Sequence, residues 1–139
     1  CTPWVNVVPI TADGQVVLVR QHRYGIEAET LEIPGGVAEA GEEPVVAAAR
    51  ELLEETGYGG GDWESLGWVW SNPAIFDNRT WMFLARGVRL ERAPDLDPAE
   101  DLSVERVDVA AIPALLASGR IAHSLAVVSL QRFLLRGSP

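Results

Sequence analysis

Short runs of β-branched and other apolar residues, separated by turn residues, occupy most of the chain and predict β-strands. Residues 5–10 and 16–21 form the first two runs, and the Asp13-Gly14 pair between them is typical of a hairpin turn. A third run, at residues 30–33, is expected to stop at Pro34-Gly35-Gly36. Further strands are predicted at residues 64–70, 80–86 and 104–109.

Three segments show helical features instead. Pro44 stands in the first turn of a predicted helix, and Gly57 follows it at a position where helices often end. Two more helices are predicted at residues 110–118 and 124–135. Strands mixed with few helices, with the helices clustered late in the chain, indicate an α+β layered domain. Trp68 and Trp70 alternate with Leu66, so all three are expected to pack on one core face.

The helix before Gly57 carries Glu51, Glu54 and Glu55. Spacings of three and four residues place these side chains on one face, where like charges repel each other. A divalent cation would convert this repulsion into attraction, and Mg²⁺ prefers carboxylate oxygens together with waters and substrate phosphates. The alternative interpretation is a solvated acidic face, which is what most glutamate-rich helix surfaces are.

The residues around these glutamates decide between the two interpretations. The segment 36–58 fits the spacing G-x5-E-x7-R-E-U-x-E-E-x-G-U, where U is a bulky apolar residue or tyrosine. Seven fixed positions match by chance with a probability on the order of one in 10⁸ per starting position. This pattern is the Nudix box, and the chain resembles the Nudix hydrolase family. The resemblance implies an α/β/α sandwich, with a mixed sheet between helices.

The box assigns separate roles to its residues. Glu51 and Glu55, one helical turn apart, are the pair expected to reach a common ion, with Glu54 as a further ligand or a partner of Arg50. Arg50 is expected to form a bidentate pair with a box carboxylate. Glu42 is expected to hold the preceding loop against the helix. The resemblance also implies a metal-ligating backbone carbonyl at Gly36 or the residue before it, with Mg²⁺ as the cofactor and Mn²⁺ as a substitute.

Outside the box, residues 19–24 and the L-E-I-P-G-G segment at 31–36 are similar to the ADP-ribose pyrophosphatase branch of the family. This similarity implies that Arg23 and Glu32 contact substrate or a partner subunit. Pro73 matches the downstream proline of the branch, and Arg79 or Asn78 in the same region could contact sugar or phosphate. The loop at residues 71–79 differs from the glycine-rich version usual in the branch.

The acidic loop at residues 92–101 is a second candidate source of catalytic groups. The resemblance implies a further carboxylate there, acting as general base or metal ligand, and Glu100 fits this role first, Asp101 second. The alternative is a solvated loop. The group that activates water stays open among Glu100, Glu54 and a metal-bound hydroxide.

Composition limits the partners. The chain has 139 residues and a net charge of −9, which argues against nucleic-acid polymers because these are held mainly by Lys and Arg. No apolar run reaches the roughly 20 residues of a membrane span. A single cysteine excludes an internal disulfide and is compatible with the cytoplasm. We expect one domain over residues 1–139 and a small-molecule nucleotide as partner.

The most favoured function is metal-dependent hydrolysis of a nucleoside diphosphate linked to a sugar, yielding a nucleoside monophosphate and a sugar phosphate. A nucleoside triphosphate pyrophosphohydrolase and a non-catalytic nucleotide sensor are the alternatives, although the complete set of box carboxylates favours an enzyme. The branch is dimeric, so a homodimer is expected. Only 35 residues precede the box, so the N-terminal segment with which the branch builds its swapped dimer is expected to be short or removed.

Overall fold

The computed structural model describes residues 2–23, 25–96 and 102–136. Within this part of the chain, eight strands form one sheet around the order β3-β2-β1-β7-β5, with β4 pairing with β1, β6 with β7 and β8 with β2. The strands are β1 (Trp4–Thr11), β2 (Gln15–Arg23), β3 (Ala28–Glu32), β4 (Gly35–Val37), β5 (Tyr58–Gly59), β6 (Asp62–Trp70), β7 (Arg79–Leu90) and β8 (Leu102–Asp108). The helices are α1 (Pro44–Thr56), η1 (Val109–Ala111), α2 (Ile112–Ala117) and α3 (Ser124–Arg136).

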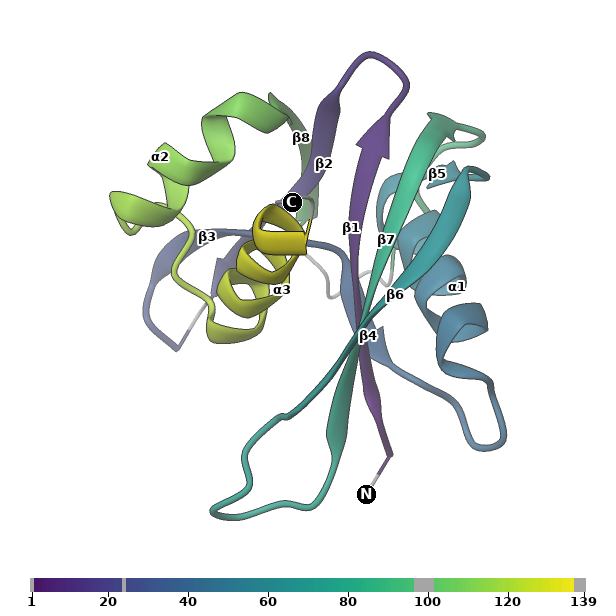
Figure 1. The fold of residues 1–139 in the computed structure, drawn as a ribbon, viewed down its shortest axis with the longest axis vertical. Helices are drawn as coiled ribbons and strands as arrows, with labels where there is room; N and C mark the ends of the chain where they lie inside the picture. The colour runs from purple at the N-terminus through teal and green to yellow at the C-terminus, as the bar shows by residue number, and fades with distance from the viewer. Residues whose placement is uncertain (1, 24, 97–101, 137–139) are drawn as a thin grey trace.

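The centre of the sheet joins strands that are far apart in the sequence. β1 and β2 form the predicted antiparallel hairpin, with Ile10 opposite Val16 and Gly14 at the turn with φ of 83°. β1 also pairs with β7 in parallel, from Trp4 opposite Thr80 onward (Figure 1). The sheet is therefore mixed, as the family resemblance implied.

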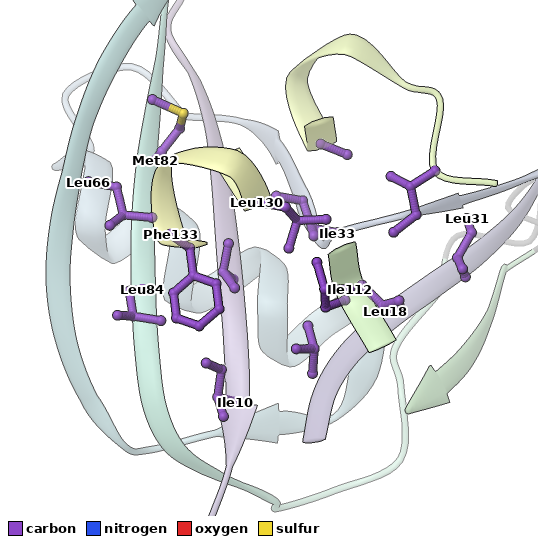
Figure 2. Packing of buried hydrophobic residues seen from close by; sticks show 14 residues of the cluster. Ile10, Leu18, Leu31, Ile33, Leu66, Met82, Leu84, Ile112, Leu130 and Phe133 are labelled. Atoms are coloured by element: carbon purple, nitrogen blue, oxygen red, sulfur yellow. The ribbon is translucent and has the colours of Figure 1, made fainter. Parts of the chain in front are cut away.

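Helices cover both faces of the sheet (Figure 1). Under α3, Leu130 and Phe133 pack on Met82, Leu84 and other residues of one buried cluster (Figure 2). Under α1, two smaller clusters combine residues of the helix with the opposite face of the sheet: Val7, Val17, Leu52, Tyr58, Ala85 and Val88 in one, and Val5, Ala38, Ala47, Ala48 and Phe83 in the other. Because both faces are covered, β1 is buried from Val5 to Ile10. The α+β prediction and the α/β/α sandwich are confirmed.

Helix α1 has the limits that its end signals predict. Pro44 begins the helix, and Gly57 follows it in the left-handed conformation with φ of 78°. The N–H of Gly57 donates to the carbonyl of Leu53 at 2.9 Å, which ends the helix. No helix in the described residues is both long and apolar enough to cross a membrane.

The predicted stop at Pro34-Gly35-Gly36 needs a correction. β3 ends before Pro34, but Gly35 and Gly36 begin another strand, β4, which pairs antiparallel with Asn6 and Val5 of β1. A Cβ on Gly35 would overlap the carbonyl oxygen of Val5 and the side-chain oxygen of Asn6. Glycine at this position therefore permits an unusually close approach to β1.

The prediction that Trp68 and Trp70 share a core face with Leu66 is wrong. The pairing of β6 with β7 shifts between Ser65 and Gly67, and Gly67 has φ of 89°, as in a β-bulge. The extra residue breaks the alternation of side chains along the strand. Leu66 is buried in the cluster under α3, whereas Trp70 is 47% exposed.

Candidate active site

Arg50, on helix α1, organises the carboxylates of the box. Its Nε and Nη2 donate to Glu42 at 2.9 and 3.0 Å, which is a bidentate pair. Its Nη1 lies 3.1 Å from Glu51 Oε1 and 3.3 Å from Glu54 Oε2. Its fourth partner is the carbonyl oxygen of Val37 in β4, which accepts from Nη2 at 3.2 Å. The guanidinium of Arg50 thus connects helix α1, the loop before it and strand β4.

The ion pair between Arg50 and Glu42 changes the acidity of both groups. Hydrogen bonding to Glu42 raises the pKa of Arg50 above its ordinary value. Hydrogen bonding from Arg50, supported by the backbone N–H of Glu39, lowers the pKa of Glu42. Glu42 therefore stays ionised and holds the residues before the helix in place, in the geometry expected for it.

The Gly35-Gly36 pair meets two of the box glutamates. The N–H of Gly35 donates to Glu55 Oε1 at 3.0 Å. A Cβ on Gly36 would lie 2.6 Å from Glu51 Oε1, so any side chain there would displace this carboxylate. Glu51 and Glu55 thus reach the same two residues of backbone. This places the pair expected to bind a common ion beside the backbone expected to assist it.

The donors at this position suit a hard divalent cation. They are carboxylate oxygens of Glu51 and Glu55, with the glycine backbone adjacent, and Mg²⁺ prefers such oxygens. Among the residues the structure describes, no three His, Cys, Asp or Glu side chains form a ready ligand cluster. Mg²⁺ usually takes one or two carboxylates and keeps several waters. The residues present therefore fit an ion completed by water and substrate oxygens.

A cavity of about 280 Å³ adjoins the box glutamates. Strands, the loop between β6 and β7, and the start of α3 all contribute to its walls. Its lining residues are Trp4, Asn6, Val19, Gln21, Glu32, Ile33, Gly35, Gly36, Glu55, Ser71, Phe76, Asn78, His123 and Leu125. The cavity thus extends from Glu55 and the glycine pair to elements distant in sequence. A mainly apolar, largely preformed pocket with a few polar groups is typical of a small-molecule site.

Two of the polar residues that line this cavity, Glu32 and Asn78, are buried. Glu32 is 7% exposed, and one of its oxygens accepts a hydrogen bond from the Thr30 hydroxyl. Asn78 is 9% exposed, and its Oδ1 has no hydrogen-bond partner in the described structure. Neither arginine nor lysine is among the described lining residues.

Of the other candidates from the sequence, two lie outside the cavity wall, and the side chains of two more lie outside the described part of the structure. Arg79 stacks over the rings of Trp68 and Trp70, at 4.2 and 5.1 Å from their centroids, and does not line the cavity. Pro73 is exposed and is also absent from its walls. Arg23 ends β2, but its side chain lies outside the described residues, as does Glu100. The roles assigned to these four residues stay predictions.

Asn6 is a lining residue that the sequence did not suggest. It sits between Val5 and Val7 in an apolar strand, so its own context carries no signal of function. Asn78, by contrast, was a candidate contact for sugar or phosphate in the loop at residues 71–79, and the structure places it in the cavity wall. Only the pairing of β1 with β7 brings these two segments to one end of the sheet (Figure 1).

Comparison with known proteins agrees with this geometry. The family model described as the NUDIX domain matches residues 2–126. The chain belongs to the Nudix family. The spacing of the box residues was the feature on which the resemblance was based, and the sandwich fold that it implied is the fold observed.

The chain is also similar to individual proteins of known name. It is 36% identical over 133 residues to the methanol dehydrogenase activator of Bacillus methanolicus, covering 91% of the chain and 69% of that protein. It is 38% identical over 112 residues to the ADP-ribose pyrophosphatase of Bacillus subtilis, covering 80% of the chain and 60% of that protein. A crystal structure of an ADP compounds hydrolase aligns with a TM-score of 0.85 and 28% identity, over 97% of this chain and 73% of that one. The chain is thus shorter than each of these relatives.

Proposed function

We propose that this chain hydrolyses the diphosphate bridge of a nucleoside diphosphate linked to a sugar, such as ADP-ribose, to a nucleoside monophosphate and a sugar phosphate. The observation that carries the proposal is that the cavity adjoins the glutamates of the box. The cavity shares Gly35, Gly36 and Glu55 with the carboxylate cluster. An uncharged end of a substrate in the cavity would therefore present its phosphates to the box. The relatives named for ADP-ribose and ADP compounds support the same substrate class.

Each box residue has a separate task in this reaction. Glu51 and Glu55 would hold a divalent cation, for which we propose Mg²⁺ with Mn²⁺ as a substitute. When bound, the cation neutralises charge on the diphosphate and lowers the pKa of water. Arg50 fixes the orientation of Glu51 through the contact at 3.1 Å. Glu42 in turn fixes Arg50.

The proton of the attacking water has two candidate acceptors, Glu54 and Glu100. Glu54 lies on the exposed side of the Arg50 network, with its side chain 38% exposed. The carbonyl of the same residue accepts a hydrogen bond from Asp95 N at 2.8 Å, which attaches the start of the acidic loop to α1. If Glu100 is the base, Glu100→Gln should lower kcat more than it weakens metal binding, whereas Glu51→Gln should impair both.

Hydrolysis in ¹⁸O-labelled water with Mg²⁺ tests the reaction. A panel of nucleoside diphosphate sugars and nucleoside triphosphates should yield monophosphate products from the diphosphate sugars first. The label should appear in a phosphate group, because a carboxylate site of this kind suits attack on phosphorus. Label on a sugar carbon would overturn the mechanism. Faster release of pyrophosphate from triphosphates would replace the proposed substrate class.

We further propose a cytoplasmic homodimer in which Arg23 of one subunit acts on substrate held by the other, whereas Glu32 lines the cavity beside Glu55 of its own chain. Light scattering of the active protein tests the dimer directly. Mixing Arg23→Ala subunits with Glu51→Gln subunits tests the shared site, since a hybrid dimer would regain one intact site. An active monomer would refute both statements and leave the hydrolysis unaffected.

A further inference from the structure

Strand β6 leads into a loop that supplies part of the cavity wall. Ser71, Phe76 and Asn78 belong to this loop, which joins β6 to β7, and all three line the cavity. The hairpin formed by the two strands extends well beyond α3, with the loop at its far end (Figure 1). The position of the loop therefore depends on how β6 is held nearer the body of the domain.

Arg132 of α3 holds β6 at its bulge. Its Nη1 donates to the carbonyl of Leu66 at 3.1 Å and to the carbonyl of Trp68 at 3.3 Å. These carbonyls belong to the residues on either side of Gly67, and a Cβ on Gly67 would lie 2.8 Å from the same nitrogen. The guanidinium thus lies directly against the bulge.

The bulge is a place where β6 needs support from outside the sheet. The pairing with β7 shifts between Ser65 and Gly67, so one residue of β6 has no partner opposite it. An extra residue of this kind interrupts the ladder of hydrogen bonds and bends the strand. Within the described residues β6 pairs only with β7, so no second strand lies on its other side. Arg132 supplies the support from α3.

Helix α3 forms another part of the same cavity wall. His123, just before the helix, and Leu125, in its first turn, both line the cavity. Leu130 and Phe133 anchor the helix on the sheet, because they are buried in the cluster beneath it. The hydrogen bonds of Arg132 therefore connect two parts of the cavity wall that are far apart in the sequence.

We propose that Arg132 is a positioning residue for the substrate: its bonds to the bulge of β6 fix the loop at residues 71–78 relative to α3 and so set the shape of the cavity. Arg132 is not among the described residues that line the cavity. A wall held in this way needs little ordering when a ligand binds, which favours affinity. The proposal rests on the proposed binding of substrate in this cavity and leaves the chemistry of Glu51 and Glu55 unchanged.

Two arginines of α3 give a matched comparison. Arg132→Met keeps much of the apolar stem and removes the donors, whereas Arg132→Lys keeps a donor. Arg136 also links α3 to β6, through an ion pair with Glu64, which precedes the bulge. Arg136→Met therefore removes a second link between the same two elements without changing the contact at Gly67. Thermal unfolding shows whether each variant is folded, and Arg132→Gln replaces Arg132→Met if the latter is not.

Amide hydrogen exchange of the unliganded protein is the first measurement, because it depends on no activity. In the parent, Ser71 N donates to the carbonyl of Asn78 at 3.2 Å and closes the loop. Arg132→Met should speed exchange of this amide about tenfold, while the amides of α1 exchange as in the parent. Arg132→Lys and Arg136→Met should exchange as the parent does. Unchanged exchange in Arg132→Met, or an equal acceleration in Arg136→Met, would overturn the proposal.

Steady-state kinetics with ADP-ribose and Mg²⁺ then measure the effect on substrate. Arg132→Met should raise KM about tenfold, because the loop then has to be ordered on binding, and should change kcat by less than about threefold. Arg132→Lys and Arg136→Met should keep KM within about threefold of the parent. A fall in kcat with unchanged KM would overturn the proposal, as would equal KM values for Arg132→Met and the parent.

A double-mutant cycle with Gly67→Ala links the effect to the bulge. A methyl group on Gly67, where φ is 89°, should displace the guanidinium and raise KM by itself. If both changes act through the bulge, combining Gly67→Ala with Arg132→Met should raise KM little more than either change alone, and additive effects would overturn the proposal. A parent that does not hydrolyse ADP-ribose would count against the proposed function instead. The exchange measurement would still decide whether Arg132 holds the loop.

Discussion

The two halves of the site differ in how the chain builds them. The carboxylate half comes almost entirely from residues 36–57, with Arg50 bonded to Glu42, Glu51 and Glu54. The cavity half collects side chains from β1, β2, β3, β4, the loop at residues 71–78 and α3. The first half is charged and closely bonded, and the second is largely apolar with a few buried polar groups.

This difference suggests that the carboxylate half carries out catalysis and that the cavity half binds and selects the substrate. The carboxylate half can be formed by one helix and one short strand, so the same reaction can be combined with many cavities. The cavity half depends on loop and strand ends, where sequence varies most easily without loss of the fold. Changes in the first half should therefore affect kcat, and changes in the second half should affect KM and substrate choice.

The strongest test of this division is removal of the catalytic carboxylates. Glu51→Gln and Glu55→Gln should each lower kcat by roughly two decades or more, the range for losing a charge-stabilising group. Glu43→Gln, an exposed change just before the same helix, should leave kcat within about twofold because the side chain of Glu43 forms no cap hydrogen bond to α1. Steady-state kinetics with Mg²⁺ measure this. Near-parental turnover in both box variants would remove the assignment.

A second test asks whether the carboxylate half is self-contained. Gly57 ends α1 with φ of 78°, and a Cβ there would overlap the carbonyl oxygen of Arg92. Gly57→Ala should therefore lower the free energy of unfolding by about 2–4 kcal/mol, from the left-handed backbone together with the clash. Gly41→Ala is the control, since φ there is 77° and a Cβ would contact nothing within 4 Å.

Gly41→Ala should cost only about 1–2 kcal/mol, the backbone contribution alone. Chemical denaturation of both variants gives the comparison. Equal losses would mean that the segment at Arg92 moves away from the added methyl group without measurable cost, although Asp95 N remains bonded to the carbonyl of Glu54.

The carboxylate half is local in the sequence and the cavity half is not, and this explains how much of each the sequence could predict. The box and its helix were predictable because Glu51, Glu54 and Glu55 are neighbours along the chain, and helical periodicity places them together without tertiary information. The strands of the hairpin and the mixed sheet followed from apolar runs and from the family resemblance. The cavity did not follow in this way. Asn78 was a candidate within its loop, but only the pairing of β1 with β7 brings it and Asn6 into the wall of one cavity.

The failed prediction for Trp68 and Trp70 has a related cause. A strict alternation of side chains places them with Leu66, but the bulge at Gly67 adds one residue to β6 and reverses the faces beyond it. A glycine in the middle of an apolar strand was the available signal. The result is a half-buried Trp68 beside an exposed Trp70, with Arg79 stacked on both rings and absent from the cavity wall.

A third prediction concerns the cavity half. Glu32→Gln should raise KM about tenfold and change kcat by less than about threefold, because the buried carboxylate recognises substrate without acting on the phosphates. Glu29→Gln is the matched control on the same strand: its side chain is 58% exposed and lies 3.6 Å from Arg20. It should leave both constants unchanged. A large fall in kcat for Glu32→Gln with unchanged KM would place Glu32 in the catalytic half.

The smallest expected effect concerns acid stability and returns to the ion pair between Glu42 and Arg50. The hydrogen bond from Arg50 lowers the pKa of Glu42 in the folded state below its value in the unfolded chain. This pair therefore adds stability above the unfolded pKa of about 4.3, and the contribution disappears as pH falls through the lower, folded pKa. The midpoint temperature of the parent should fall more steeply between about pH 5 and pH 3 than that of Glu42→Gln. Glu39→Gln keeps the backbone N–H that donates a hydrogen bond to Glu42, so its midpoint temperature should vary with pH as that of the parent does. Parallel curves for the parent and Glu42→Gln would mean that Arg50 orients the box by geometry alone, without favouring the ionised form of Glu42.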